Sequence, residues 1–306
     1  QLQGLLCGTI MVIVQKVGST DDGKQVIVQS SKAVLELLFK ILNGQRSAPH
    51  VEALLALSAL INCLELEFVK HMETFLPYIL NAITYIQDTD AVAVGAGRIQ
   101  DLCNTLGDKL IPFLEPIAQC LITTVSKCDA SLSHSAIASI LGACGDLCLA
   151  VEAAFTPYLP HVLPLLKLAA DYSVSGECIQ NVFSEDRVIL INGVLEAYAS
   201  MLQGSKDHEA MQAIILPFTP DMYKFFQSVY NDEDRDDDNS WNLVGCVGDL
   251  ADIFGTKIAQ LFHAPEGDRI AWYWVLLTEC AQEAEDESVL NTVNFAQEAI
   301  KRATTG

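Results

Sequence analysis

The chain has 306 residues, of which 39 are acidic and 18 are basic, giving a formal net charge of −21. A negative field of this strength repels nucleic acid and anionic membranes and attracts basic partners, although the same acidity also serves solubility. Hydrophobic residues make up 51% of the chain, enough for a large core. No apolar run is long enough to cross a bilayer, so neither a transmembrane segment nor a signal peptide is expected. The first residue, Gln1, falls inside a helical pattern, which indicates a piece of a longer protein.

A Pro-aromatic pair recurs along the chain and marks an internal repeat. It occurs, at spacings of 35, 45 and 60 residues, at Pro77-Tyr78, Pro112-Phe113, Pro157-Tyr158 and Pro217-Phe218. Proline suits the first turn of a helix, where its missing N–H would have no intrahelical partner in any case. Each pair is therefore predicted to open a second helix.

A second element, an apolar stretch with one acidic residue, recurs between these pairs. It occupies residues 98–107, 143–152, 193–202 and 246–255, which carry Asp101, Asp146, Glu196 and Asp249. These stretches are predicted to be first helices. The third is followed by about ten extra polar residues, 203–212. The fourth lacks the Pro-aromatic pair, and its second helix is expected to start near Thr256-Lys257.

The period of about forty residues is typical of HEAT and armadillo arrays, and the third short helix of an armadillo unit is not evident. We therefore predict an all-α fold, an α-solenoid of HEAT repeats built from antiparallel helix pairs that stack to bury their apolar stripes. Residues 1–306 are expected to form a single array. Its approximate units are 1–45, 46–88, 89–128, 129–172, 173–231, 238–283 and 284–306.

The densest local signal is the acidic run at residues 231–239. Its alternating aspartates resemble a calcium loop, but Asp237 stands at the glycine position and Leu243 at the closing glutamate position. Like charges at this density repel one another and stay extended. We interpret the run as an inter-helix loop that contacts a basic partner without contributing to folding. The residues from Asp238 to Ser240 are expected to cap a helix that begins near Trp241.

No motif for catalysis, a metal or a cofactor is evident. Cys144 and Cys148 share a helix face, but no histidine lies at a matching spacing, so packing is the better interpretation. Most of the ten cysteines lie in apolar helical stretches and no Cys-x-x-Cys occurs, which favours free thiols in the cytosol or nucleus. We expect no enzyme and no cofactor. The aromatic residues that gather in the last quarter fit either core packing or interface anchoring. They are Trp241, Trp272, Tyr273, Trp274 and Phe295.

Several segments, in order and spacing, are similar to one known family. They include LEFVKHMETFLPYI at 66–79, GRIQDLCNTLGDKLIPF at 97–113, ACGDLCLAVEAAFTPYL at 143–159, NDEDRDDD at 231–238, VGDLADIFGTKIAQL at 247–261 and VLNTVNFAQEAIKR at 289–302. Over nearly its whole length the chain resembles the carboxyl-terminal third of importin-β, the karyopherin-β family of nuclear import receptors.

The resemblance implies that these repeats wrap the basic helical segment of importin-α, or a basic cargo segment, and offer shallow sites to Phe-Gly nucleoporins. It also implies a cytoplasmic and nuclear location, including the nuclear pore, and a chain that lacks most of the surface for Ran. Phe295 stands where the family often has tryptophan. The candidate contacts are Glu115, Asp221, Asp232, Glu233, Asp234, Asp236, Asp237, Asp238, Trp241 and Phe295. Of these, Glu115 and Asp221 lie near the starts of second helices, which should face the concave side.

Two other binding roles remain open at this point, and an enzyme is a distant third. A HEAT scaffold subunit of a phosphatase or similar assembly would bind folded subunits, and it would not need a charge of −21. Another karyopherin-β would bind its cargo directly. All three binding roles use a protein surface, and none involves nucleic acid or a membrane.

Overall fold

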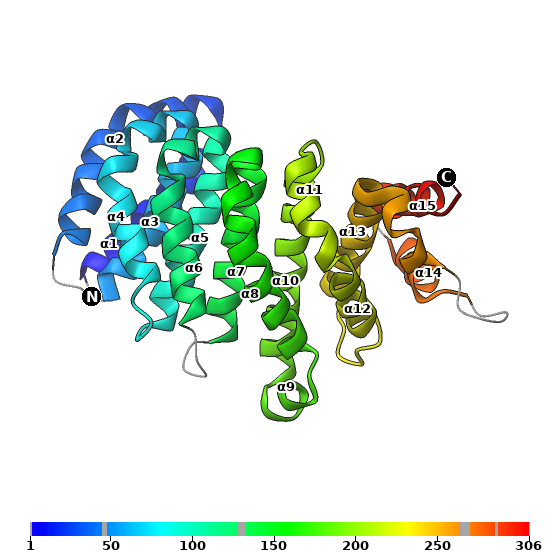
Figure 1. Ribbon diagram of the computed structural model, residues 1–306. Helices are drawn as coiled ribbons and strands as arrows, with labels where there is room; N and C mark the ends of the chain where they lie inside the picture. The colour runs from blue at the N-terminus through cyan, green and yellow to red at the C-terminus, as the bar shows by residue number, and fades with distance from the viewer. Residues whose placement is uncertain (1, 45–47, 128–132, 264–269, 285–286, 306) are drawn as a thin grey trace. The chain divides into compact units, whose positions relative to one another are not determined.

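The computed structural model describes residues 2–44, 48–127, 133–263, 270–284 and 287–305. The chain divides into two compact units, Gln1–Ala143 (unit 1) and Cys144–Gly306 (unit 2). The predicted all-α fold is confirmed, because long helices follow one another in pairs and the described residues contain no strand (Figure 1).

Unit 1 is built from three helix pairs, with a further helix, α7 (His134–Val151), beginning near its end. The pairs are α1 (Leu2–Val17) with α2 (Asp21–Leu42), α3 (Ala48–Leu64) with α4 (Met72–Ile83), and α5 (Thr89–Leu106) with α6 (Leu114–Ser126). The first helices α1, α3 and α5 pack on one another in sequence, and α4 packs against both α5 and α6. Leu57 and Ile99, on facing first helices, are fully buried. Stacking thus buries the apolar stripes that no single helix could cover.

Unit 2 repeats this scheme with an insertion. Its helices are α8 (Leu159–Ser173), α9 (Gly176–Asn181), α10 (Ser184–Ser205), α11 (Glu209–Ile215), α12 (Thr219–Tyr230), α13 (Asp237–Phe254), α14 (Trp272–Glu283) and α15 (Glu287–Thr305). The first helices α10, α13 and α15 pack in sequence, and α12 contacts both α8 and α14. The short helix α9, which sequence analysis did not predict, connects α8 to α10 and lies at their lower ends in Figure 1.

Most hairpins turn through a 3-10 helix rather than a simple loop. These are η1 (Glu65–His71), η2 (Gly107–Phe113), η3 (Glu152–Tyr158) and η5 (Gly255–Phe262). The first residue of each has positive φ, between 46° and 54°. Glycine adopts this backbone freely, whereas a side chain strains it, so two of the four corners are conformationally relaxed and the two with glutamate are strained.

The structure corrects the expected starts of the second helices. Pro112 and Pro157 lie at the ends of η2 and η3, and Pro217 lies in η4 (Leu216–Phe218), so each precedes its second helix rather than opening it. Pro77 lies inside α4. Thr256-Lys257 belongs to η5, whose helical geometry is broken at Ile258, and the next described α-helix begins at Trp272.

One stretch, His134–Ser173, is long and apolar enough to pass a test for a membrane span by length and composition. It is not one helix, because α7 ends at Val151 and η3 separates it from α8. Of its most apolar window, 61% is already buried against the rest of the protein. This stretch is therefore better explained as core helices of the stack, as the sequence predicted.

Candidate partner-binding surface

The negative charge is very unevenly distributed between the two units. Unit 1 has 13 acidic and 9 basic residues, and unit 2 has 26 acidic and 9 basic residues. The net charges of −4 and −17 place most of the acidity in unit 2. A basic partner would therefore be attracted chiefly to unit 2, which also contains every candidate contact except Glu115.

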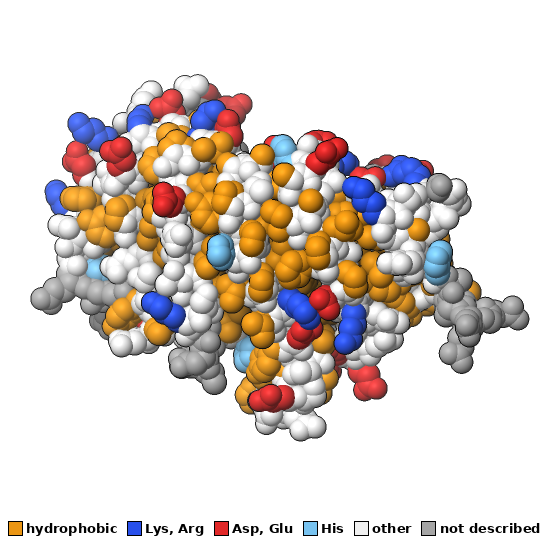
Figure 2. Space-filling view, in the orientation of Figure 1, with side chains coloured by type: hydrophobic (Ala, Val, Ile, Leu, Met, Phe, Trp, Pro, Cys, Tyr) orange, Lys and Arg blue, Asp and Glu red, His pale blue; other side chains and the backbone are white. Residues whose placement is uncertain are grey.

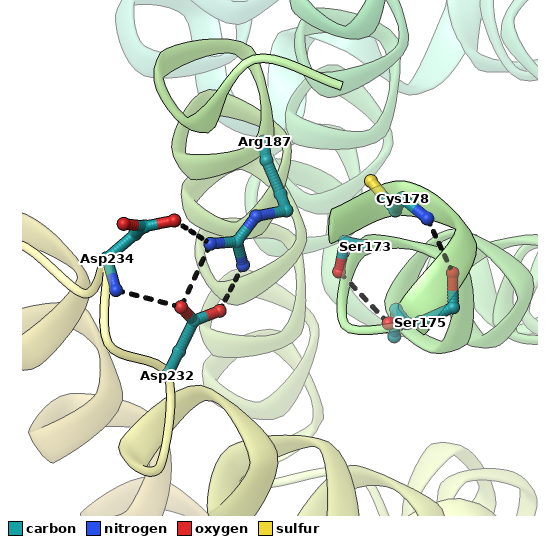
Figure 3. A network of polar contacts seen from close by, with 7 residues as sticks. Ser173, Ser175, Cys178, Arg187, Asp232 and Asp234 are labelled. Atoms are coloured by element: carbon teal, nitrogen blue, oxygen red, sulfur yellow. Dashed lines mark hydrogen bonds and ion pairs between the residues drawn. The ribbon is translucent and has the colours of Figure 1, made fainter. Parts of the chain in front are cut away.

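The acidic run directly follows α12 and packs against α10, where Asp232 and Asp234 bind the guanidinium of Arg187 (Figure 3). Both Nη atoms of Arg187 donate to the Asp232 carboxylate, with Nη2 2.9 Å from Oδ1. Nη2 also donates to Asp234 Oδ2 at 2.6 Å, and the Asp234 amide donates to Asp232 Oδ1 at 3.0 Å. This bidentate arrangement is the geometry in which arginine binds carboxylate most strongly.

The ion pair between Arg187 and Asp232 is nearly closed to solvent, with side-chain exposures of 2% and 9%. Burial by itself raises the pKa of Asp232, but the Arg187 guanidinium and the Asp234 amide outweigh it and hold the pKa below its usual value. The expectation that the run has no part in folding is therefore wrong for Asp232, since the two charges compensate each other inside the protein. Sequence periodicity could not indicate the ion pair between Arg187 and Asp232.

The cap of α13 also differs from the expected one. Asp236 is the N-cap residue, and its Oδ1 accepts from the Asn239 amide at 2.7 Å. The helix thus begins at Asp237 rather than near Trp241. Asp237 and Asp238 fall in the first turn, where the helix dipole favours negative charge. Asp236 therefore has a structural role, and the predicted cap between Asp238 and Ser240 is wrong.

Three acids of the run remain free for a partner. Glu233, Asp237 and Asp238 are exposed and make no ion pair with a described residue. Asp234 contributes to both roles, because its side chain is 52% exposed although it contacts Arg187. The accessible acidity of the loop is therefore concentrated at its tip and at the start of α13.

The second helices α8 and α12 carry one acidic residue each. The acids of α8 and α12 are Asp171 and Asp221, and both pair with Lys167, at 2.7 and 3.3 Å. Over α8 and α12, Figure 2 shows basic and acidic side chains close together among hydrophobic and uncharged ones, so this acidity is offset by neighbouring basic residues. Glu115 is exposed in the first turn of α6, in unit 1. Among the candidate acids, the loop and the start of α13 therefore hold the largest group.

The two candidate aromatics lie on consecutive first helices of unit 2. Trp241 of α13 is 39% exposed and lines a small hollow of about 80 Å³ with Val289 and Thr292 of α15. Phe295 of α15 is half-buried against α13, where its ring edge approaches Gly248. Trp241 is thus accessible to a partner, whereas Phe295 mainly fixes α15 to α13.

The aromatics around Trp272 form a packed cluster. Trp272 Nε1 donates to the Tyr223 hydroxyl at 3.1 Å, and Tyr273 is buried with its hydroxyl donating to the Phe262 carbonyl at 2.7 Å. These residues pack α14 against α12 and η5. Core packing is therefore the correct interpretation for Trp272 and Tyr273.

Three of the four repeated acids of the first helices accept a hydrogen bond from a neighbouring first helix. Asp101 accepts from the Ser58 hydroxyl at 2.7 Å, Asp146 from Ser200 at 3.1 Å, and Asp249 from the Gln203 amide at 2.9 Å. Burial raises the pKa of Asp249 to about 6. The spacing of these acids marks the repeat in the sequence, but it does not indicate the interhelix contacts that they make.

The nine cysteines within the described ranges are free thiols, and all except the half-buried Cys120 are buried. Burial raises the pKa of both Cys120 and Cys280 to about 11. Cys128 lies outside the described residues. In the same ranges no three or more His, Cys, Asp and Glu side chains form a group that could hold a metal ion.

Comparison with known proteins gives a consistent result. The family described as importin subunit beta-1-like, TPR repeats, matches residues 1–267. Importin subunit beta-1 of Arabidopsis thaliana is 30% identical over 303 residues, and that of Schizosaccharomyces pombe is 25% identical over 305 residues. Each alignment covers 99% of this chain and 34% of the relative, so the chain spans about a third of the length of these proteins.

Solved structures show the same fold. Yeast importin-beta (Kap95p) superposes with a TM-score of 0.81 at 21% identity, covering 100% of this chain and 34% of the other. A complex of Kap95 with Nup1 gives a TM-score of 0.81 at 22% identity, with the same coverage. The helix pairs are thus those of an α-solenoid, and by its sequence the chain belongs to the importin subunit beta-1-like family.

Proposed function

We propose that this chain is part of a nuclear transport receptor and that unit 2 binds the basic helical segment of importin-α. One observation carries the proposal, namely that unit 2 has 26 acidic and 9 basic residues whereas unit 1 is close to balanced. A lysine- and arginine-rich helix gains Coulomb energy along such a surface, and its rate of association is raised as well. A general scaffold subunit has no need of this asymmetry.

The contacts would combine charge with one aromatic anchor. Glu233 is exposed in the loop before α13, Asp237 and Asp238 are exposed in its first turn, and Trp241 follows one turn later on the same helix. Exposed acids supply attraction that salt screens, and a partly exposed tryptophan supplies apolar contact area. Asp232, through its buried pair with Arg187, and Asp236, as the N-cap of α13, would hold this surface in place.

Calorimetry with a synthetic basic segment of importin-α tests the proposal, with a scrambled peptide of equal charge as control. We expect the native order to bind more tightly and its affinity to fall steeply above physiological salt, where the screening length drops below about 8 Å. Absence of binding at low salt would refute the adaptor role. Equal binding of the scrambled peptide would leave only nonspecific attraction and would favour a scaffold.

A second binding function, for Phe-Gly nucleoporins, is supported by the hollow beside Trp241 and by the Nup1 complex of a structural relative. Both roles require no catalysis and match a protein that works in the cytoplasm, at the nuclear pore and in the nucleus. Replacing Trp241 with Ala should weaken the binding of a Phe-Gly peptide. Replacing Tyr172, which is equally exposed at 39%, with Ala should leave that binding unchanged. Equal loss in both variants would argue against the hollow as the site.

A further inference from the structure

Unit 1 contains a groove that no part of the proposed function uses. It lies between α2 and the start of α4 and encloses about 380 Å³. Leu35 and Phe75 form its floor and are almost fully buried. Phe39 forms a wall, 38% exposed, and is held in place by an edge-on contact with Tyr78, whose ring centroid lies 6.0 Å away. The groove is thus a formed apolar hollow with space for one large side chain.

The rim of the groove is basic in an otherwise acidic protein. Lys32 and Lys40 are exposed on α2, on either side of Glu36, and neither makes an ion pair with any described residue. His71 lies at the opposite side, where burial first and Lys70 second lower its pKa, so it is neutral near pH 7. The positive charge at the rim therefore comes from the two lysines.

The spacing of the lysines defines the ligand. Lys32 and Lys40 are eight residues apart on one helix, which places their backbones about 12 Å apart at a rise of roughly 1.5 Å per residue. An extended peptide rises about 3.3 Å per residue, so residues i and i+4 span a similar distance and share one face with residue i+2. Acids at the outer two positions can meet the lysines while the middle side chain enters the groove.

We propose that this groove binds an extended acidic protein segment in which an aromatic residue lies midway between two acidic residues four positions apart. The acids pair with Lys32 and Lys40, and the aromatic ring packs on Leu35, Phe39 and Phe75. Glu36, between the lysines, disfavours a third acid at the centre and so contributes to specificity. This partner has the opposite charge to the one proposed for unit 2, and the two sites take different ligands.

The test uses the full chain and a fluorescein-labelled peptide, Asp-Ser-Phe-Ser-Asp flanked by Gly and Ser, followed by anisotropy at low salt. The double variant Lys32→Glu/Lys40→Glu should bind about tenfold more weakly or not at all, since two attractions become repulsions. The matched double variant Lys224→Glu/Lys301→Glu makes the same charge change on exposed lysines of unit 2 and should bind normally. Helical circular dichroism verifies that each variant is folded.

Three further peptides, with Lys in place of both Asp residues, with Asn in place of both, or with Ala in place of Phe, separate charge from apolar docking. A peptide with Lys in place of both Asp residues should bind the Lys32→Glu/Lys40→Glu variant better than it binds the native chain. A peptide with Ala in place of Phe should lose binding to the native chain. The proposal is overturned if the native chain fails to bind the acidic peptide at low salt, or if the Asn-substituted peptide binds as well as the acidic one. It is also overturned if the Lys-substituted peptide binds the Lys32→Glu/Lys40→Glu variant no better than it binds the native chain.

Discussion

Asp232 receives both Nη groups of Arg187 in a nearly closed pocket of unit 2, so one carboxylate of an apparently free acidic loop neutralises the largest buried side chain of the protein. The loop is thereby fixed to α10 at one end and to α13, through Asp236, at the other. The exposed acids between and after these two points are held in defined positions. A loop anchored in this way loses less conformational entropy when a partner binds.

Replacing Asp232 with Ala should destabilise the protein by roughly 3–5 kcal/mol, because it leaves the Arg187 charge buried without its main partner. The matched change Asp237→Ala removes an exposed acid from the same run and should cost less than about 1 kcal/mol. Urea unfolding followed by circular dichroism measures both. Equal midpoints for the two variants would show that Arg187 does not depend on Asp232.

The ion pair between Arg187 and Asp232 should also affect how the free energy of unfolding depends on pH under acidic conditions. Since the folded pKa of Asp232 is lowered, its contribution is present above the unfolded value of about 3.9 and disappears as pH falls through the lower folded value. The native chain should therefore lose stability more steeply than Asp232→Ala below about pH 4. Parallel profiles for the two proteins in that range would contradict this assignment.

Asp249 should affect stability in the opposite direction. Burial raises its pKa to about 6, so the charged form is disfavoured in the folded state, and the cost grows as pH rises from about 4 to above 6. Replacing Asp249 with Asn, which can still accept from Gln203, should stabilise the protein at pH 7 on the order of 2 kcal/mol. The gain should vanish near pH 4. Asp207→Asn makes the same chemical change at an exposed position in the same unit, without relieving a buried charge, and should leave the stability at pH 7 nearly unchanged.

The corner glycines allow a test of backbone strain free of steric effects. A methyl group on Gly107 would meet no atom within 4 Å, yet its φ of 54° is costly for any residue with a side chain. Gly107→Ala should therefore destabilise by about 1–2 kcal/mol. Gly97→Ala, equally uncrowded but inside α5, should instead stabilise by about 0.5–1 kcal/mol. The same sign for both substitutions in thermal unfolding would exclude a backbone origin.

Sequence periodicity predicted the helix pairs because stacking buries a stripe that repeats every three to four residues. It failed where a single backbone angle or a single distant contact decides the structure. Glu65 and Glu152 occupy corner positions that favour glycine, so no residue type marked them as corners. The partner of Arg187 lies 45 residues away, in a run whose composition alone indicates a solvated loop. The apolar groove beside Phe39 likewise arises only when α2 and α4 meet.

The anchored loop also determines which acids can be removed to test binding. Asp234 and Asp236 hold Arg187 and the α13 cap, so changing them would confuse stability with affinity. The variant Glu233→Gln/Asp237→Asn/Asp238→Asn removes only exposed charges and should lower the melting temperature only slightly, through the lost charge–dipole interactions in the first turn of α13. The variant should bind the basic segment with roughly three- to tenfold lower affinity at 50 mM salt. The loss should be smaller at higher salt, because salt screens these contacts.

The control for this variant removes three exposed acids from unit 1, as Asp22→Asn/Glu73→Gln/Asp90→Asn. Both triple variants change the net charge by the same amount, so a purely long-range attraction would weaken equally in the two. A local contact at the start of α13 predicts a clear loss only in the first. Calorimetry at several salt concentrations distinguishes these outcomes, since the difference between the variants should shrink as the screening length falls below the distance between contacting charges.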